Sequence, residues 1–420
     1  MTRNPRKRLA RLFPLGFLVL LCSAPIIGEA ADFKSDREFL TRHTRVIELG
    51  DGDARVLICP EHQGRVMTST CRGPGGSSFG WINRKFITAG KPSPQFNNYG
   101  GEDRFWLAPE GGQFSLWFAP GKAQTFGNWA TQPGLNDGAF RVVSQSARRC
   151  LMATRMKLTN ASGTKFDLAV GRSVRMLDSR RFSDLFGASA AAALEQDGVK
   201  SVGFETKNTI TNLGQPFTQS GGMVSLWILG MFKPGGETVI IAPYHAGEKA
   251  KLGPVVKDDY FGTVPPSRLK VTPQAILFYG DGKFRSKIGT SQRRAKPVAG
   301  SIDFRAGVLT LVHFSQPPRP SEHRYLNNSW DLPQKNPYVG DVFNSYNDGP
   351  TEPGAESLGG FYELETLSPA LPLETGQSLT HAHRTFHVQG DLKALARLAK
   401  AALGVDLEAV RKTMLGSLQN

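Results

Sequence analysis

The sequence predicts an all-β fold with a small helical appendage, on three observations. The chain of 420 residues contains 46 Gly, 27 Pro and 26 Phe, which is typical of many turns between short, aromatic-rich strands. Its apolar content of 40% is adequate for a packed core. Strand-like runs recur along most of the chain, and clear helical spacing appears only after residue 390. At this length the chain can form one large domain or two ordinary ones.

The N-terminal segment has the pattern of a targeting sequence. Basic residues precede a short apolar run, residues 12–22, which is too short for a comfortable membrane span. Small residues stand at the −3 and −1 positions of a cleavage site before Ala31. We therefore expect residues 1–30 to be a signal peptide and the protein to be exported, to the periplasm or outside the cell. A lipid anchor at Cys22 is the alternative, although Leu21 is bulkier than lipoprotein processing normally accepts.

The charge balance limits the classes of partner. The formal net charge is +15, and about +11 once residues 1–30, with five basic groups and one acid, are removed. The Lys and Arg residues are scattered, and no helix-turn-helix, RNA-binding strand signature or zinc-finger spacing accompanies them. We therefore expect no nucleic-acid partner. No later run of 18 apolar residues exists, so we expect no membrane span, while the oligomeric state stays open.

Cysteine and histidine patterns give no sign of a metal or cofactor. Three cysteines follow residue 30, and in an exported protein Cys59–Cys71 would close a short loop and leave Cys150 free. None of them has metal-site spacing with a His. His381 and His383 share one strand face, for which we favour surface exposure over a transition-metal site. Phosphate-loop, dinucleotide and zinc-protease motifs are absent from the sequence, so no cofactor is expected.

Short strands account for most of the predicted elements. A turn at Gly50-Asp51-Gly52-Asp53 indicates a hairpin between the first two. Gly pairs bracket the charged and aromatic segment 97–112, which favours a loop where the backbone approaches a ligand. The Ala-rich stretch 181–197 predicts a short helix. The segments with strand character are 46–49, 54–59, 64–70, parts of 139–177, 202–213, 224–232, 239–243, 275–279 and 308–314.

The C-terminal part combines a long loop with two helices. Residues 315–358 are rich in Pro, Asn, Asp and Gly, and are too long to be a simple connection. Within them, 341–349 carries oxygen ligands suited to calcium but lacks the regular spacing, so turn chemistry is favoured. Asp391 and Asp406 are suited to cap two helices that form a hairpin. The expected divisions are a signal peptide, 1–30, a β domain, 32–390, and a helical appendage, 391–420.

One late strand carries two acids. A Gly pair opens the stretch 359–369 and Ser-Pro closes it, so it reads as one strand between turns. Side chains alternate across a strand, so Glu363 and Glu365 share a face. Two acids on one face repel each other unless water, a cation or a sugar hydroxyl separates them. The simplest interpretation is a solvated face, and the alternative is a pair of acids in a binding site.

The order of motifs resembles that of the galactose-mutarotase-like superfamily, and within it an uncharacterised family of secreted bacterial proteins. The resemblance covers roughly residues 40–390. It implies a large antiparallel β-supersandwich with a carbohydrate cleft on its concave face, and a mono- or oligosaccharide as partner. The stretches that carry it are Gly100–Glu110, Thr211–Pro216, Tyr362–Thr366 and Leu373–Ser378.

The resemblance also implies roles for single residues. In aldose mutarotases a Glu on a late strand removes the anomeric proton, and a mid-chain His protonates the ring oxygen. Leu364-Glu365-Thr366 matches the Glu strand, so Glu365 inherits the base role, with Glu363 as a modulator or binding group. The matching mid-chain stretch, 223–229, contains no His. His245, one strand later, is the candidate substitute and His313 another, although a structural role is favoured for both.

Four further residues are candidates for substrate binding. Arg104 can bind sugar hydroxyls or a sugar carboxylate, and Trp106 beside it can stack on a pyranose face. The alternative places Trp106 in the core and Arg104 in solvent. Glu102 adds an acid nearby. Arg172 and Arg175 lie on opposite faces of their strand, so at most one of them faces a cleft.

The sequence therefore favours a carbohydrate-binding protein of the bacterial cell envelope, with a mutarotase-like cleft and an unknown ligand. The missing His favours binding over catalysis. The alternative is an aldose epimerase-like or other sugar-active enzyme that uses Glu365 as general base. A structural envelope protein with a decayed cleft is a third class, and likeness of fold does not decide between them.

Overall fold

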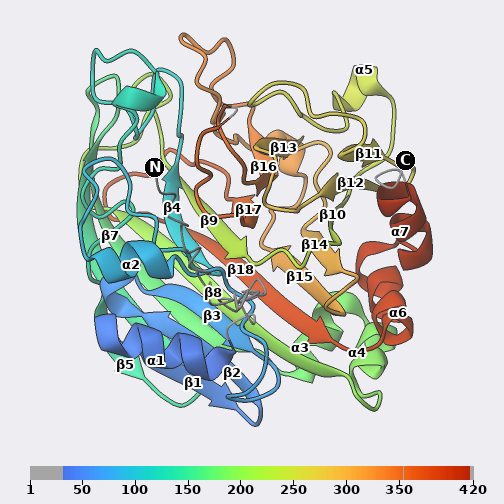
Figure 1. Cartoon of the computed structure of the whole chain (residues 1–420). Helices are drawn as coiled ribbons and strands as arrows, with labels where there is room; N and C mark the ends of the chain where they lie inside the picture. Colours follow the sequence, from blue (N-terminus) through green and yellow to red (C-terminus); the bar gives the residue numbers. More distant parts are fainter. Residues whose placement is uncertain (1–31, 353, 417–420) are drawn as a thin grey trace, which may run out of the picture.

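Antiparallel strands dominate the structure, a computed structural model that describes residues 32–352 and 354–416 (Figure 1). Two large antiparallel sheets and a pair of C-terminal helices confirm the predicted fold class. The signal peptide expected over 1–30 lies outside the described residues. No helix within the described ranges has the length and apolar character needed to cross a bilayer.

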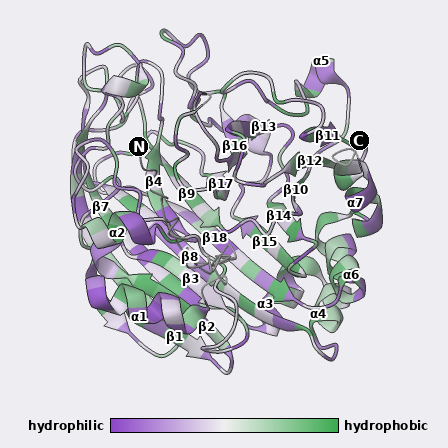
Figure 2. Ribbon diagram, viewed as in Figure 1, coloured by the Kyte–Doolittle hydropathy of each residue, from purple (hydrophilic) through white to green (hydrophobic). Residues whose placement is uncertain are grey.

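The largest sheet has ten strands, in the order β11-β12-β10-β14-β15-β18-β8-β7-β6-β5. Along β7, buried residues alternate with more exposed ones, and Figure 2 shows such alternation of hydrophobic and hydrophilic residues in this sheet. This pattern is typical of strands with one face on the core. In the sheet's order, the strands are Leu269–Val271, Ala275–Tyr279, Thr238–Pro243, Val298–Asp303, Val308–Phe314, Ser378–Gln389, Lys200–Asn212, Lys165–Met176, Arg149–Thr159 and Arg141–Gln145.

A five-stranded sheet, in the order β13-β16-β17-β9-β4, forms the second layer. Its central strand, β17, is the predicted Glu strand, and it pairs with β16 on one side and β9 on the other. Two strands of this sheet were predicted as loops: β4 lies within 97–112 and β16 within 315–358. Both predictions were wrong because the pairing partners come from distant segments, β9 for β4 and β13 for β16. The strands are Ser286–Ser291, Asp341–Asn347, Tyr362–Leu367, Ser225–Phe232 and Arg104–Ala108.

The N-terminal part forms a small three-stranded sheet, β1-β2-β3, covered by helices. The predicted hairpin is confirmed, with β1 paired to β2 around the Gly-rich turn. Helix α1 was not predicted, although Asp32 caps it by accepting a hydrogen bond from the Ser35 backbone N–H at 2.7 Å. These elements are β1 Ile47–Asp51, β2 Ala54–Cys59, β3 Arg65–Thr70, α1 Phe33–His43 and α2 Arg84–Ala89, with 3₁₀ turns η1 Pro60–His62, η2 Phe126–Asn128 and η3 Pro320–Glu322.

The ten-stranded sheet separates two hydrophobic cores. On β10, Ile240 faces the large core shared with the five-stranded sheet, whereas Val239 and Ile241 face a smaller core under helices. Figure 1 shows α3, α4, α6 and α7 along this second face. The C-terminal helix pair is confirmed, whereas the stretch 181–197, predicted as one short helix, forms two, α3 and α4, which meet at Gly187. The helices are α3 Ser179–Phe186, α4 Ala188–Leu194, α6 Leu392–Leu403 and α7 Leu407–Leu415, with α5, Lys249–Leu252, on a loop.

The predicted disulfide is wrong. Cys59, Cys71 and Cys150 are free and buried. Cys59 ends β2, where it packs with Leu57 and Met67 in a small cluster beneath α1. Cys71 instead belongs to the large core, so the two sulfurs serve as small apolar groups in different clusters.

Candidate functional site

The two faces of β17 have different surroundings. Tyr362 Oη and Ser301 Oγ are hydrogen-bonded at 2.8 Å, and Thr366 Oγ1 contacts the rings of His381 and His383 at 2.9 Å each. This face therefore packs against the ten-stranded sheet. Glu363 and Glu365 lie on the opposite face and line a cleft of about 910 Å³. The two acids share a strand face, as predicted, and both therefore line this cleft.

The predicted exposure of the C-terminal histidines is wrong. His381 and His383 are fully buried between the sheets. Burial lowers the pKa of each to about 3, so both rings are neutral at physiological pH. Within the described residues, no group of three or more His, Cys, Asp or Glu side chains is arranged to hold a metal ion.

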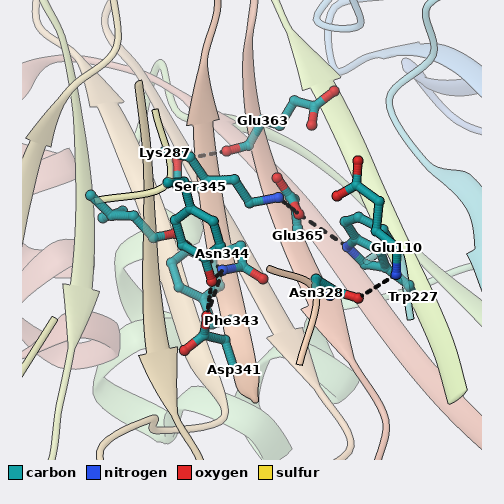
Figure 3. Close-up of polar contacts among 12 residues, drawn as sticks. Glu110, Trp227, Lys287, Asn328, Asp341, Phe343, Asn344, Ser345, Glu363 and Glu365 are labelled. Atoms are coloured by element: carbon teal, nitrogen blue, oxygen red, sulfur yellow. Dashed lines mark hydrogen bonds and ion pairs between the residues drawn. The ribbon is translucent and has the colours of Figure 1, made fainter. Parts of the chain in front are cut away.

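Glu365 is held by two donors from other strands of its sheet (Figure 3). Lys287 Nζ on β13 lies 2.9 Å from Glu365 Oε2, and Trp227 Nε1 on β9 donates to the same oxygen at 3.0 Å. Burial alone would lower the pKa of Lys287, but the charges of Glu365 and Glu110 outweigh it and raise that pKa. No N–H or hydroxyl donor of the described residues reaches the second carboxylate oxygen, Oε1, which is buried, although the neighbouring Glu363 carboxyl group interacts with Glu365. Because Glu365 lines the cleft, this acceptor lies beside the space that a ligand would fill.

Glu363 has a different environment. Its carboxyl group is ion-paired with Arg104 of β4, which also lines the cleft. Burial raises the pKa of Glu363 to about 8; Arg104 opposes this rise, and the negative charge of Glu365 adds to it. At neutral pH a large fraction of Glu363 therefore carries a proton, and the hydrogen bond to Arg104 then reaches its carbonyl oxygen. The Nε of Arg104 is a buried donor without a partner in the described chain.

A third carboxyl group, Glu110, enters the cleft from the segment after β4. Its backbone N–H donates to Asn328 Oδ1 at 2.9 Å, and its carboxylate accepts from Trp129 Nε1 at 3.1 Å. Burial raises the pKa of Glu110, and the Lys287 cation counteracts this effect. The hydrogen bond to Asn328 also fixes the long segment 315–340 against the cleft, so part of the predicted loop forms a wall of the site.

Aromatic side chains form the other component of the cleft. Trp106 packs edge-on against Trp227, with ring centroids 5.4 Å apart, and the Arg104 guanidinium lies 4.9 Å from the Trp106 ring centroid. Trp106 thus belongs to both the core and the cleft. Trp129 stacks on Trp117 at 5.1 Å with nearly parallel planes. Flat apolar rings beside paired charges are suited to a ligand that has both apolar faces and hydroxyl edges.

Tyr260 and Asp341 brace the opposite wall. Tyr260 Oη donates to Asp341, and the amide of Asn344 reaches the same carboxylate oxygen at 3.2 Å. Lys257 Nζ lies 4.3 Å from the Tyr260 ring centroid and donates to Ser329 Oγ at 2.5 Å. The polar stretch 341–349, predicted as turns, thus starts as strand β16, and its first carboxylate anchors the wall.

Three sequence-predicted site residues lie outside the cleft. Glu102 is fully buried elsewhere, where it accepts hydrogen bonds from Ser69 at 2.5 Å and from His387 at 3.0 Å. It misses the cleft because β4 begins only at Arg104, so the strand alternation does not extend back to it. The prediction that Glu102 binds substrate therefore has no geometric support.

Arg172 and His245 are also displaced from the cleft. Arg172 faces the core from the ten-stranded sheet and forms a fully buried ion pair with Asp103 at 2.5 Å. His245 lines a separate shallow pocket, and His313 lies in β15, where burial lowers its pKa to about 4. Burial also lowers the pKa of His245. Neither histidine is available as the acid partner of Glu365 in this structure.

Two important residues were missed by sequence reasoning. Lys287 stands alone in a polar strand, and its partner is 78 residues away, so no local pattern marks it. Trp227 lies in the stretch 223–229, which was noted only for lacking a His. That stretch supplies an indole N–H to Glu365 instead. The only sequence clue to its role was a Trp in a strand that could pair with the Glu strand.

Comparison with known proteins gives a family. A family model described as a family of unknown function, DUF6786, matches residues 31–414. The chain belongs to this family. A search of curated proteins finds no match.

Solved structures similar to this member of DUF6786 include proteins with mutarotase-related names. One from Escherichia coli K12, named among the aldose 1-epimerases, is 11% identical over 83% of this chain and 99% of its own, with a TM-score of 0.47. A galactose mutarotase-like protein from Lactobacillus casei is 11% identical over 82% and 100%, with a TM-score of 0.42. A galactose mutarotase related enzyme from Lactobacillus acidophilus is 8% identical over 83% and 97%, also at 0.42. The resemblance noted in the motifs is to this same group, and at such identity it concerns the fold alone.

Proposed function

We propose that this protein binds a carbohydrate in the cleft above β17. The observation that carries the proposal is the pair of buried acids, Glu363 and Glu365, at the floor of a cleft of about 910 Å³ lined by aromatic rings, with Glu365 Oε1 reached by no N–H or hydroxyl donor of the described chain. Sugars present hydroxyl groups at their edges and C–H groups on their faces. The acids of the floor therefore suit the hydroxyl edges, and the aromatic rings that line the cleft suit the apolar faces.

The charged pairs on the floor support binding over a merely structural role. Taking a carboxylate out of water is expensive unless its lone pairs are satisfied. The core pair Arg172–Asp103 meets this condition, because Thr206 and Asn208 complete its hydrogen bonds. On the cleft floor, by contrast, no N–H or hydroxyl group within the described ranges donates a hydrogen bond to Glu365 Oε1. A ligand hydroxyl would supply the missing donor.

The test is calorimetry or saturation-transfer NMR with a panel of neutral, acidic and amino sugars and their short oligomers. Binding is expected for at least one member, and Glu365→Gln should weaken it by about tenfold or more, because a neutral amide is a weaker acceptor for a ligand hydroxyl than a carboxylate is. Glu374→Gln, an exposed acid remote from the cleft lining, is the matched control and should change nothing. No binding of any saccharide at millimolar concentration would refute the proposal.

A second function, sugar isomerisation, is favoured by the contrast between Glu363 and Glu365. The two carboxyl groups share a face, yet one is held by the Lys287 cation and the other retains its proton to about pH 8. Such a contrast assigns a base and an acid. In this scheme Glu365 takes the anomeric hydroxyl proton while Glu363 gives its proton to the ring oxygen, and the C1–ring oxygen bond breaks. Rotation of the aldehyde and reversal of both transfers yield the other anomer.

NMR exchange between α and β anomers measures this activity directly. Acceleration by the native protein, lost in both Glu363→Gln and Glu365→Gln, is expected if the pair transfers protons. A native protein that binds a sugar without accelerating its anomer exchange would exclude the isomerase and leave the binding function intact.

We also propose that the protein is exported, on the strength of the N-terminal pattern before Ala31. Cell fractionation followed by N-terminal mass spectrometry tests this, with a mature chain starting at Ala31 as the expected result. A chain that retains residues 1–30 in the cytoplasm would contradict it, and a lipidated Cys22 would point to the anchored alternative.

A further inference from the structure

Two exposed aromatic platforms flank the cleft, and we infer from them that its ligand is an oligosaccharide rather than a single sugar. This inference rests on the proposed carbohydrate-binding function. One sugar residue would lie on the floor at Glu363 and Glu365, and its neighbours would stack on Phe126 and Phe261.

The size of the cleft is the first argument. A hexose has about twelve non-hydrogen atoms. Even at the roughly 30 Å³ that one water molecule occupies in the liquid, these atoms would fill only about 360 Å³. The cleft holds about 910 Å³. A single hexose would leave most of the lining in contact with water, whereas pockets normally bury most of their ligand's surface and match it in size.

The first platform is a row of parallel rings that leads outward. Trp117 is buried, Trp129 stacks on it, and Phe126 continues the row with a plane only 12° from that of Trp129. Phe126 is 56% exposed. It lies in η2, on the segment between β4 and β5 at the upper left of Figure 1. A ring held flat by a tryptophan beneath it, and open above, is suited to stacking on a sugar face.

The second platform comes from another part of the chain. Phe261 is 42% exposed and belongs to the segment between β10 and β11, towards the upper right of Figure 1. The guanidinium carbon of Arg285 lies 3.8 Å from its ring centroid, and Tyr346 packs against its edge. Arg285 also lines the cleft. The ring is therefore fixed in orientation, with a hydrogen-bond donor beside it for hydroxyl or carboxylate groups.

The two platforms together indicate an extended ligand. Phe126 and Phe261 both line the same cleft as Glu365. Single exposed apolar residues are ordinary on protein surfaces. Two rings of fixed orientation on the walls of one cleft with a polar floor indicate instead that both contact the same ligand. Their separation in sequence also excludes an accident of one local turn. A chain of sugar residues is the ligand that contacts a polar floor and two flat apolar walls at once.

Calorimetry with gluco-, xylo-, chito- and galacturono-oligosaccharides of one to six residues tests the inference. For the series that binds, affinity should rise at least tenfold between one and four residues. Phe126→Ala and Phe261→Ala should each weaken binding of the longest member by about two- to tenfold, as expected for lost stacking contacts. Neither change should alter the affinity for the monosaccharide.

Phe284→Ala is the matched control. Phe284 is 41% exposed and has an arginine, Arg268, over its ring, but it does not line the cleft. This variant should bind every member of the series like the native protein. Monosaccharide binding with no gain on chain extension would refute the inference and leave the carbohydrate-binding proposal standing. Equal losses for mono- and oligosaccharides in the Phe126 and Phe261 variants would also refute it. Absence of all binding would refute both.

Discussion

Replacing Glu363 with Gln should change how stability depends on pH. The folded protein raises the pKa of this carboxyl group from 4.5 to about 8, chiefly by burial. Between these values the folded chain holds a proton that the unfolded chain has released, so the group lowers stability as pH rises. The slope is about 1.4 kcal/mol per pH unit for one proton, and the total effect is at most about 5 kcal/mol. A glutamine resembles the protonated acid and has no such dependence.

Urea unfolding at half-unit steps from pH 5 to 8.5 measures this effect. Native protein and Glu363→Gln should be similarly stable at pH 5, and the variant should become more stable by several kcal/mol at pH 8.5. Glu374→Gln, which removes an exposed carboxyl group, should follow the native curve. Parallel curves for native protein and Glu363→Gln would refute the protonated state of Glu363, and with it the acid role in the isomerase scheme.

Three further outcomes follow from other contacts. Asp103→Ala should lower the unfolding free energy by about 3–5 kcal/mol, because it leaves the buried Arg172 guanidinium without its counter-charge. Adding Arg172→Met should restore most of this loss. If Asp103→Ala alone is within about 1 kcal/mol of the native protein, the structural role of the pair is contradicted. Asp348→Ala should lower the free energy of unfolding by about 2–3 kcal/mol, because the Asp348 carboxylate accepts hydrogen bonds from the backbone N–H groups of Gly359 and Gly360 at 2.8 Å each. Hydrogen exchange at these two N–H groups should become faster. Unchanged exchange there would show that other contacts hold the segment. Thiol reagents should leave Cys59, Cys71 and Cys150 unmodified in the folded protein and label all three after unfolding, because each of them is buried.

The sequence was informative where the pattern is local. The Glu strand lies between turn residues and alternates strictly, so its existence and the shared face of Glu363 and Glu365 could be predicted. The Asp391 and Asp406 caps likewise mark the two C-terminal helices, since each accepts a backbone hydrogen bond at the helix start. Arg104 and Trp106 were placed near a ligand from the glycines around them, and both line the cleft.

Residues whose role depends on partners distant in the sequence could not be predicted. Lys287 becomes important only because β13 and β17 both flank β16. β16 itself reads as turns because it is rich in Asn, Ser and Asp. Neighbouring segments satisfy these groups: Tyr260 donates to Asp341, and the carbonyl of Ile288 on β13 accepts from Asn344 at 3.3 Å. Glu102 and Arg172 show the reverse error. Glu102 in the Gly-rich segment and Arg172 on its strand were predicted as ligand contacts, but each forms an internal pair, with His387 and Asp103 respectively.

The central position of β17 has a consequence for how this cleft adapts. The strand is hydrogen-bonded to β16 on one edge and to β9 on the other, so the backbone that carries Glu363 and Glu365 is anchored on both sides. Phe126 and Phe261, by contrast, lie on segments outside the sheets. Floor chemistry and ligand length are therefore separable properties in this molecule. If the proposed oligosaccharide binds, exchanging the wall segments should change the length that fits, while the acids beneath keep their geometry.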